Sequence, residues 1–131
     1  MDNWYSEIEN KVLTYVKAYM KEEYPDIDVT SKAYDVYPTE FPALYLHELS
    51  PVETGQDLDN TTVNAVLSTI EIQVFTDGTE TDCRKIMTDA ISLMKKLRFN
   101  VVTFPDVLTN NNIAFAVARF RRVIGSGDAL Y

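Results

Sequence analysis

The apolar side chains of residues 3–23 recur every three or four positions, which is the spacing of an amphipathic helix. Asp2 or Asn3 can cap the first turn of this helix. Pro25 ends it, because the residue before a proline resists the helical conformation. The pattern therefore predicts one helix over residues 3–23. The members of its apolar stripe are Tyr5, Ile8, Val12, Tyr15, Val16 and Tyr19.

Two strands are predicted after this helix, over residues 28–36 and 43–49. The first alternates apolar and polar side chains, and the second is apolar on both faces for half its length. A strand that is apolar on both faces is typical of the middle of a sheet. Pro38 and Pro42 separate the two strands, and residues 50–60 are predicted to form a polar, acidic loop.

A long strand is predicted over residues 62–76, and its apolar positions change phase partway. Val63, Ala65 and Leu67 are odd positions, whereas Ile70 and Ile72 are even. An alternating pattern changes phase through a bulge, a bend or a change of packing partner. We therefore expect the first half to project as a hairpin arm with the preceding strand, while the second half lies in the core sheet. The arm around residues 50–62 is expected to be mobile until the protein assembles.

A second amphipathic helix follows, and it is the most regular pattern in the chain. Residues 79–82 form a predicted capping box, with acidic side chains near the start and Lys95, Lys96 and Arg98 near the end, as the helix dipole favours. Its predicted buried stripe consists of Cys83, Ile86, Met87, Ala90, Met94 and Leu97.

The chain closes with predicted strands over residues 99–104 and 113–124, joined by a loop through Pro105 and residues 110–112. Ala114, Ala116 and Ala118 share one face of the last strand, where small side chains would let a helix approach. The predicted order is α-β-β-β-α-β-β. The predicted fold class is α+β, with a mostly antiparallel sheet of about five strands, two main helices packed on one face and an extended β-hairpin arm. Residues 1–124 are predicted to form one domain, and residues 125–131 are expected to form a flexible tail.

The composition suits one ordinary domain of 131 residues. The longest apolar run, residues 113–118, is too short to cross a bilayer, so no membrane contact is expected. The N-terminus does not have the pattern of a signal peptide. The single cysteine, Cys83, suits a reducing compartment.

The charge of the chain is strongly acidic and unevenly placed. The net charge is −8; residues 1–65 hold 4 basic and 13 acidic side chains, whereas residues 66–131 hold 8 and 7. Such a charge disfavours wrapping of nucleic acid, and no sequence-specific nucleic acid binding is expected. The asymmetry is explained either by chance and solubility or by contacts between unlike surfaces.

Catalytic chemistry has little support in this sequence. His47 is the only histidine and lies within a predicted strand, so we interpret it as a sheet residue whose ring is satisfied locally. Cys83 lies on the buried stripe of the second helix, where thiols are usually inert. One histidine and one cysteine cannot build a structural zinc site. We predict no enzyme activity, catalytic residue, cofactor or metal.

The candidate interaction residues are charged. Arg119, Arg121 and Arg122 form the one dense basic group, with the first two on one strand face and the third on the other. Either this group is a solvated strand end paired with the protein's own acids, or it contacts an acidic surface of a partner. The acidic candidates, in the predicted arm, are Glu53, Asp57 and Asp59.

Several segments together resemble the tail terminator (tail completion) proteins of long-tailed bacteriophages. The resemblance covers most of the chain in order, and it depends on layout and local patterns rather than on an invariant signature. The segments that carry it are the N-terminal helix, Phe41-Pro42-Ala43-Leu44-Tyr45, Ile70-Glu71-Ile72-Gln73-Val74-Phe75, the helix over residues 82–97 with Met94-Lys95-Lys96-Leu97-Arg98-Phe99, and Ala118-Arg119-Phe120-Arg121-Arg122-Val123.

The resemblance implies a ring-forming homo-oligomer, usually a hexamer, on the end of the tail tube. Its implied partners are other copies of the chain, the tail tube protein and a head-completion or neck protein. The ring would stop tube polymerisation and offer a surface for head attachment, in a virion tail assembled in the bacterial cytoplasm. DNA would pass through the lumen, which an acidic chain suits. The alternatives are a head-tail connector or neck protein of similar fold, and a small ligand- or peptide-binding domain.

Overall fold

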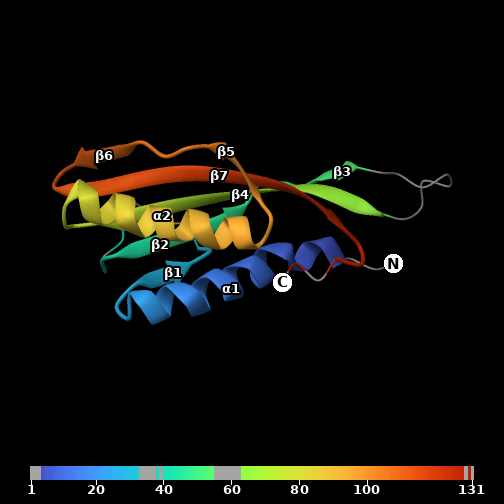
Figure 1. Cartoon of the computed structure of the whole chain (residues 1–131), viewed down its shortest axis with the longest axis horizontal. Helices are drawn as coiled ribbons and strands as arrows, with labels where there is room; N and C mark the ends of the chain where they lie inside the picture. The colour runs from blue at the N-terminus through green and yellow to red at the C-terminus, as the bar shows by residue number, and fades with distance from the viewer. Residues whose placement is uncertain (1–3, 33–37, 39, 55–62, 129, 131) are drawn as a thin grey trace.

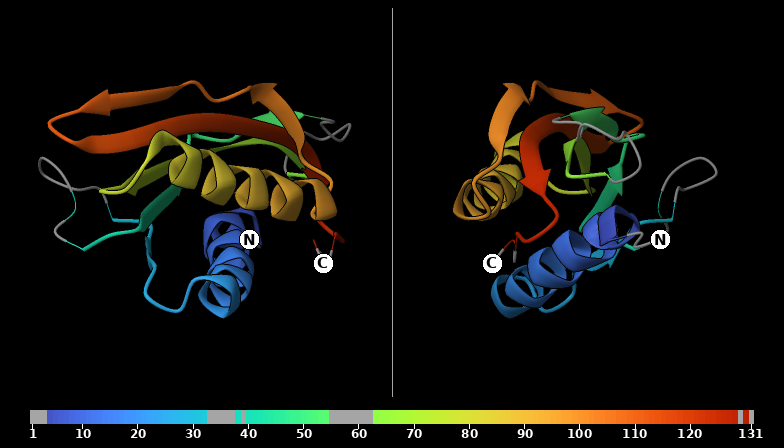
Figure 2. Two further views of the ribbon diagram at one scale, coloured as in Figure 1. Left: turned by 60° about the vertical axis from the view of Figure 1, so that its left-hand side comes forward. Right: turned by 90° about the vertical axis from the view of Figure 1, so that its right-hand side faces the viewer.

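The chain forms one mixed β-sheet with two α-helices packed against the same face (Figure 1 and Figure 2). The structure is a computed structural model that describes residues 4–32, 38, 40–54, 63–128 and 130. Within those residues the elements are a 3₁₀ helix η1 (Trp4–Glu7), α1 (Ile8–Glu23), β1 (Asp28–Thr30), β2 (Ala43–Glu48), β3 (Val52–Thr54), β4 (Ala65–Thr76), α2 (Glu80–Lys96), β5 (Asn100–Thr103), β6 (Val107–Asn110) and β7 (Ile113–Gly125).

The predicted α+β class is confirmed, but the number of strands is not. The sheet has the order β1-β2-β4-β7-β5, with β3 also beside β4 and β6 also beside β7, so seven strands replace the expected five within the described residues. The two extra strands, β3 and β6, lie in segments predicted as loops. β1 pairs with β2 in parallel, whereas the other pairs are antiparallel. The link over residues 31–42 has about the dozen residues that a parallel connection needs.

The centre of the sheet is a long antiparallel ladder between β4 and β7. It runs without interruption from Ala65 opposite Gly125 to Thr76 opposite Ala114. The even positions of β4 face the helices along the whole strand, from Val66 onwards. The predicted change of buried face is therefore wrong, because the odd apolar residues at the start of β4 belong to the opposite face. The first half of β4 does not pair with the strand predicted before it, because β2 pairs with residues 70–75. Instead the short strand β3, in a segment predicted as a loop, pairs with the first three residues of β4.

The second helix forms as its local sequence predicts. The Asp82 N–H donates to Thr79 Oγ1 at 3.2 Å, and the Thr79 N–H donates to Asp82 Oδ2 at 3.3 Å, which completes the capping box. Its predicted stripe is buried in full, and Leu93 joins it. Ala114, Ala116 and Ala118 of β7 are also buried. These small side chains allow α2 to lie close to the sheet, as predicted.

The first helix starts later than predicted, because residues 4–7 form the 3₁₀ helix and α1 begins at Ile8. The N-cap is Glu7, which makes no side-chain capping bond; the predicted caps, Asp2 and Asn3, lie outside the described residues. Its buried residues, Ile8, Val12, Val16 and Met20, pack in the same core as α2. No helix within the described part of the chain is long and apolar enough to span a membrane.

The described residues of the C-terminal segment fold back onto the body. Leu130 is buried with the hydrophobic core, and its N–H donates to Asp128 Oδ1 at 2.8 Å. Residues 129 and 131 lie outside the described part of the chain. The flexibility expected for this tail stays a prediction.

Candidate interaction surface

One face of the sheet is covered by α1 and α2, and no described helix covers the other (Figure 2). We call this second face the open face. It is formed by the odd-numbered residues of β4 and β7 and by the residues paired with them. Apolar side chains lie at its two ends and charged side chains at its centre. Its main members are Val52, Leu67 and Val123 at one end, His47, Glu71, Arg119 and Arg121 at the centre, and Phe75, Leu108 and Phe115 at the other end.

The centre of the open face is a charged row across three neighbouring strands. Glu71 of β4 lies between His47 of β2 and Arg119 of β7, with Glu71 Oε2 at 3.5 Å from His47 Nε2 and at 3.5 Å from an Arg119 amino group. Gln73 donates to the other carboxylate oxygen at 3.0 Å. The ring of Tyr45 stacks on His47 with 5.0 Å between centroids. His47 is therefore satisfied locally in the sheet, as predicted.

The three arginines have different environments, although they are close in sequence. Arg119 and Arg121 are exposed on the open face, whereas the Arg122 side chain points to the helix side and is only 8 % exposed. Arg122 donates to the Leu97 carbonyl at 3.1 Å and pairs with Asp128. The predicted division of the three between two faces is confirmed. Arg122 is therefore paired with one of the protein's own acidic side chains, which was the first of the two interpretations.

Asp128 is the acid that satisfies Arg122. Burial would by itself raise the pKa of Asp128, but the Leu130 N–H, Arg122 and Arg98 together hold that pKa below its usual value. Asp128 is thus a carboxylate at neutral pH, and it ties the chain after β7 to the C-terminal end of α2. Of the three arginines in this strand, only Arg119 and Arg121 are therefore exposed.

The acidic candidates are only partly within the described structure. Glu53 lies on β3 and is exposed. Asp57, Asp59 and the tip of the expected arm at residues 55–62 lie outside the described residues. Within those residues no group of three or more metal-ligating side chains is found. Burial raises the pKa of the Cys83 thiol to about 11, which keeps it protonated and unreactive.

A pair of glutamates joins α1 to the sheet at a site that sequence reasoning missed. The Glu48 N–H donates to Glu9 Oε2 at 2.9 Å, and the buried Ser68 hydroxyl donates to Glu48 Oε2 at 2.5 Å. Burial raises the pKa of Glu48, the bond from Ser68 opposes this, and the charge of Glu9 raises it further. The folded state therefore holds the proton of Glu48 more tightly than the unfolded chain does.

We expect Glu48→Gln to raise the free energy of unfolding at pH 7. The wild-type protein loses stability as pH rises from the unfolded pKa, about 4.3, through the raised folded pKa. Glutamine still accepts the Ser68 bond but carries no charge, so the gain should disappear below about pH 4. Urea denaturation across this pH range is the measurement, and Glu40→Gln, at an exposed site, is the control. A gain that is independent of pH would contradict the assignment.

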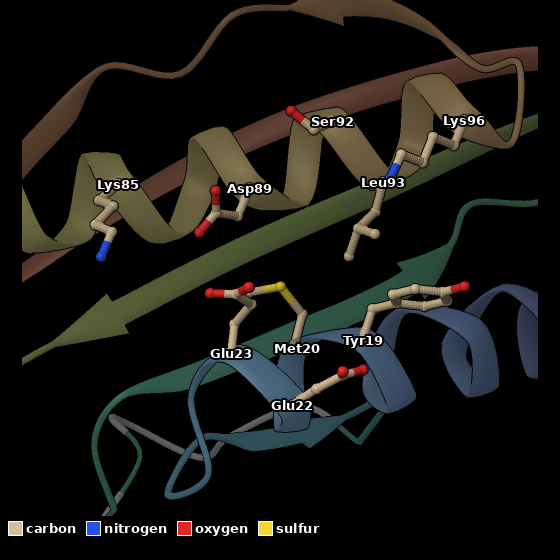
Figure 3. Close-up of a pocket in the computed structure, with 9 residues that line it drawn as sticks. All are labelled: Tyr19, Met20, Glu22, Glu23, Lys85, Asp89, Ser92, Leu93 and Lys96. Atoms are coloured by element: carbon tan, nitrogen blue, oxygen red, sulfur yellow. The ribbon is translucent and has the colours of Figure 1, made fainter.

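A groove of about 370 Å³ lies between the two helices (Figure 3). Side chains of both charges line it, including Glu23 of α1 and Lys85 and Asp89 of α2. At one end Tyr24 donates to Asp89 at 2.5 Å, and the Lys85 ammonium lies 5.7 Å from the Tyr24 ring centroid. Burial and the bond to Asp89 raise the pKa of Tyr24, so it stays a hydrogen-bond donor. The groove suits a small ligand that carries one positively and one negatively charged group.

The chain matches no known protein family, and no curated protein is significantly similar to it. A function must therefore be inferred from the sequence and the surfaces of the molecule itself.

Proposed function

We propose that this chain is a non-enzymatic structural subunit that assembles with other proteins through its sheet. The observation that carries the proposal is the open face. Its central strands have 12 and 13 residues, and helices cover them on one side only within the described structure. Val52 and Val123, at one end of this face, are 62 % and 58 % exposed. Exposed apolar surface of this kind, beside charged groups, is typical of protein interaction sites.

Within this class we propose a phage tail terminator, because of the resemblance in the order and local patterns of the segments. The chain would form a ring, hexameric in most such proteins, that caps the tail tube, stops its polymerisation and receives the head-completion protein. The uneven charge supports contacts between unlike faces of neighbouring subunits. A head-tail connector of similar fold is the alternative within the same class.

The test is to add the purified chain to polymerising tail tube protein encoded by the same genome. We expect tubes to stop growing and electron microscopy to show a ring at one end. A bovine serum albumin control should leave growth unchanged. Tubes that continue to lengthen and carry no added density at their ends would exclude the terminator function. Density found only between head and tail in whole particles would favour the connector.

A small-ligand-binding module is the second candidate, and the groove between α1 and α2 is the observation that favours it. Convergent polar groups around a pocket of this size are typical of ligand sites. A panel of zwitterionic metabolites that raises the melting temperature of wild-type protein, but not of Lys85→Ala, would support this candidate. An unchanged melting temperature with every compound would exclude it for that ligand class.

A further inference from the structure

A pocket of about 190 Å³ lies beside β3, on the face of the sheet that the helices cover. Glu53 of β3 is paired with Val66 of β4, so the two side chains point to the same face of the sheet. Val66 is buried in the core that the two helices share. The pocket is therefore lined by core residues on one side and by a carboxylate on the other. The residues that line it are Tyr5, Pro51, Glu53, Val63 and Val66.

The wall of the pocket is apolar and held in place by Trp4. Tyr5 comes from η1, Pro51 precedes β3 and Val63 precedes β4. The Trp4 indole N–H donates to the Val63 carbonyl at 3.1 Å, and the Trp4 ring meets the Tyr5 ring edge to face with 5.8 Å between centroids. A cavity of roughly 150 Å³ is large enough for a benzene ring, so this pocket can hold a group of about that size.

Glu53 is the only charged residue of the lining within the described structure. Its side chain is exposed, and it forms no ion pair with another described residue. Glu9 and Glu48 meet on the same face of the sheet, where α1 contacts the end of β2, and add negative charge there. Arg122 also lies on this face, but Asp128 neutralises it. The described charges around the pocket therefore favour a cation.

We propose that the pocket beside β3 binds an alkylammonium group, with its apolar stem on the valines and its ammonium between the Glu53 carboxylate and the Tyr5 ring. Aromatic rings attract cations to their faces, and a carboxylate accepts charge-assisted hydrogen bonds from an ammonium. A free amine and a lysine side chain of a partner protein both carry this group. The proposal goes beyond the proposed function and does not depend on it.

Other ligand classes suit the pocket less well. An anion would be repelled by Glu53. A neutral apolar ligand would remove water from the Glu53 carboxylate without offering it a partner, which costs free energy. A ligand with both charges suits the groove between α1 and α2, where Lys85 supplies a positive group, whereas no described basic side chain lines the pocket beside β3.

The first experiment titrates the intact chain with n-butylammonium chloride at constant ionic strength. The readout is the indole N–H signal of Trp4 in a nitrogen–proton NMR spectrum, because Trp4 is the only tryptophan and contacts two lining residues. We expect a saturable shift with a dissociation constant on the order of 1 mM. 1-Butanol has the same stem without the charge and should bind at least about fivefold more weakly.

Three variants test the groups assigned to the cation. Glu53→Gln keeps the shape of the side chain but removes its charge, and it should weaken n-butylammonium binding at least about fivefold. Tyr5→Leu keeps an apolar wall without the aromatic face and should weaken binding about threefold. Glu40→Gln, at an exposed site outside the pocket, changes the net charge equally and should bind like wild type. Melting temperatures show that each variant is folded.

A second ligand distinguishes the two sources of the ammonium group. Nα-acetyl-lysine methylamide carries its only charge on the side chain and has a peptide bond on either side. Binding as tight as that of n-butylammonium would support the pocket and assign it to a lysine of a partner protein. Binding of n-butylammonium alone would support the pocket and assign it to a free amine.

Three results would overturn the proposal. They are the absence of a saturable shift up to about 100 mM n-butylammonium, equally tight binding of 1-butanol, and unchanged affinity in the folded Glu53→Gln variant. None of them bears on the capping of tail tubes, which the growth of tubes measures separately. Failure of the pocket and failure of the proposed function are thus distinguishable.

Discussion

Arg122→Glu should lower the free energy of unfolding by about 3–5 kcal/mol, the range found when one partner of a buried ion pair is removed. The Arg122 side chain is 8 % exposed and pairs with Asp128, which is itself 20 % exposed. A glutamate at this position would lie near the Asp128 carboxylate and would leave the Leu97 carbonyl without its donor. Both carboxylates would be desolvated with like charges together.

Arg121→Glu is the matched control, because it makes the same change one residue earlier on the opposite face. Arg121 is exposed, and its substitution should change the free energy of unfolding by no more than about 0.5 kcal/mol. Urea denaturation of both variants at pH 7 is the measurement. Equal stabilities would show that Arg122 is not held by Asp128 in solution.

The second helix could be predicted from sequence because local features determine it. Its capping box, apolar spacing and terminal charges all lie within residues 79–98, and each agrees with the others. The buried face of the last strand could be predicted for the same reason, since Ala114, Ala116 and Ala118 alternate with larger residues. Because these local signals agree, tertiary contacts do not change the secondary structure that they predict.

The extra strands could not be predicted from the same patterns, although one signal was present. β6 and β7 are joined by Asn111 and Asn112, whose φ angles are 53° and 65°. Asparagine tolerates positive φ, and a two-residue turn of this kind joins antiparallel strands. The asparagines therefore indicate a hairpin rather than a loop. β3 has only three residues, too few for a periodic signal.

The long strand was misread because both of its faces carry apolar residues. Even residues of β4 pack against the helices, whereas Ala65 and Leu67 face the open side. A pattern that alternates cannot by itself distinguish a strand that turns over from one whose second face is also apolar in part. The apolar residues of the open face were thus visible in the sequence, but as an irregularity in a predicted core strand.

The candidate interaction residues needed the three-dimensional structure to separate them. The strand period places Arg122 on the face opposite Arg119 and Arg121, but only the path of the chain after β7 brings Asp128 to it.

Removing positive charge from the open face should slow assembly by roughly tenfold or more at low salt, because complementary charges mainly accelerate association. The variant for this test is Arg119→Gln combined with Arg121→Glu. Glutamine at 119 avoids a new carboxylate beside Glu71, which lies 3.5 Å from the arginine. Arg122 is kept because it is buried and pairs with Asp128. The subunit should therefore remain folded.

The rate of ring formation, followed by light scattering at 10 mM and 500 mM salt, is the measurement. The slowing should be large at low salt and small at high salt, since the Debye length falls from about 30 Å to a few ångströms over this range. Lys11→Gln combined with Lys17→Glu makes the same charge change on the exposed side of α1 and should slow assembly less. A slowing that is equal in the lysine control would mean that net charge alone, rather than the open face, governs assembly.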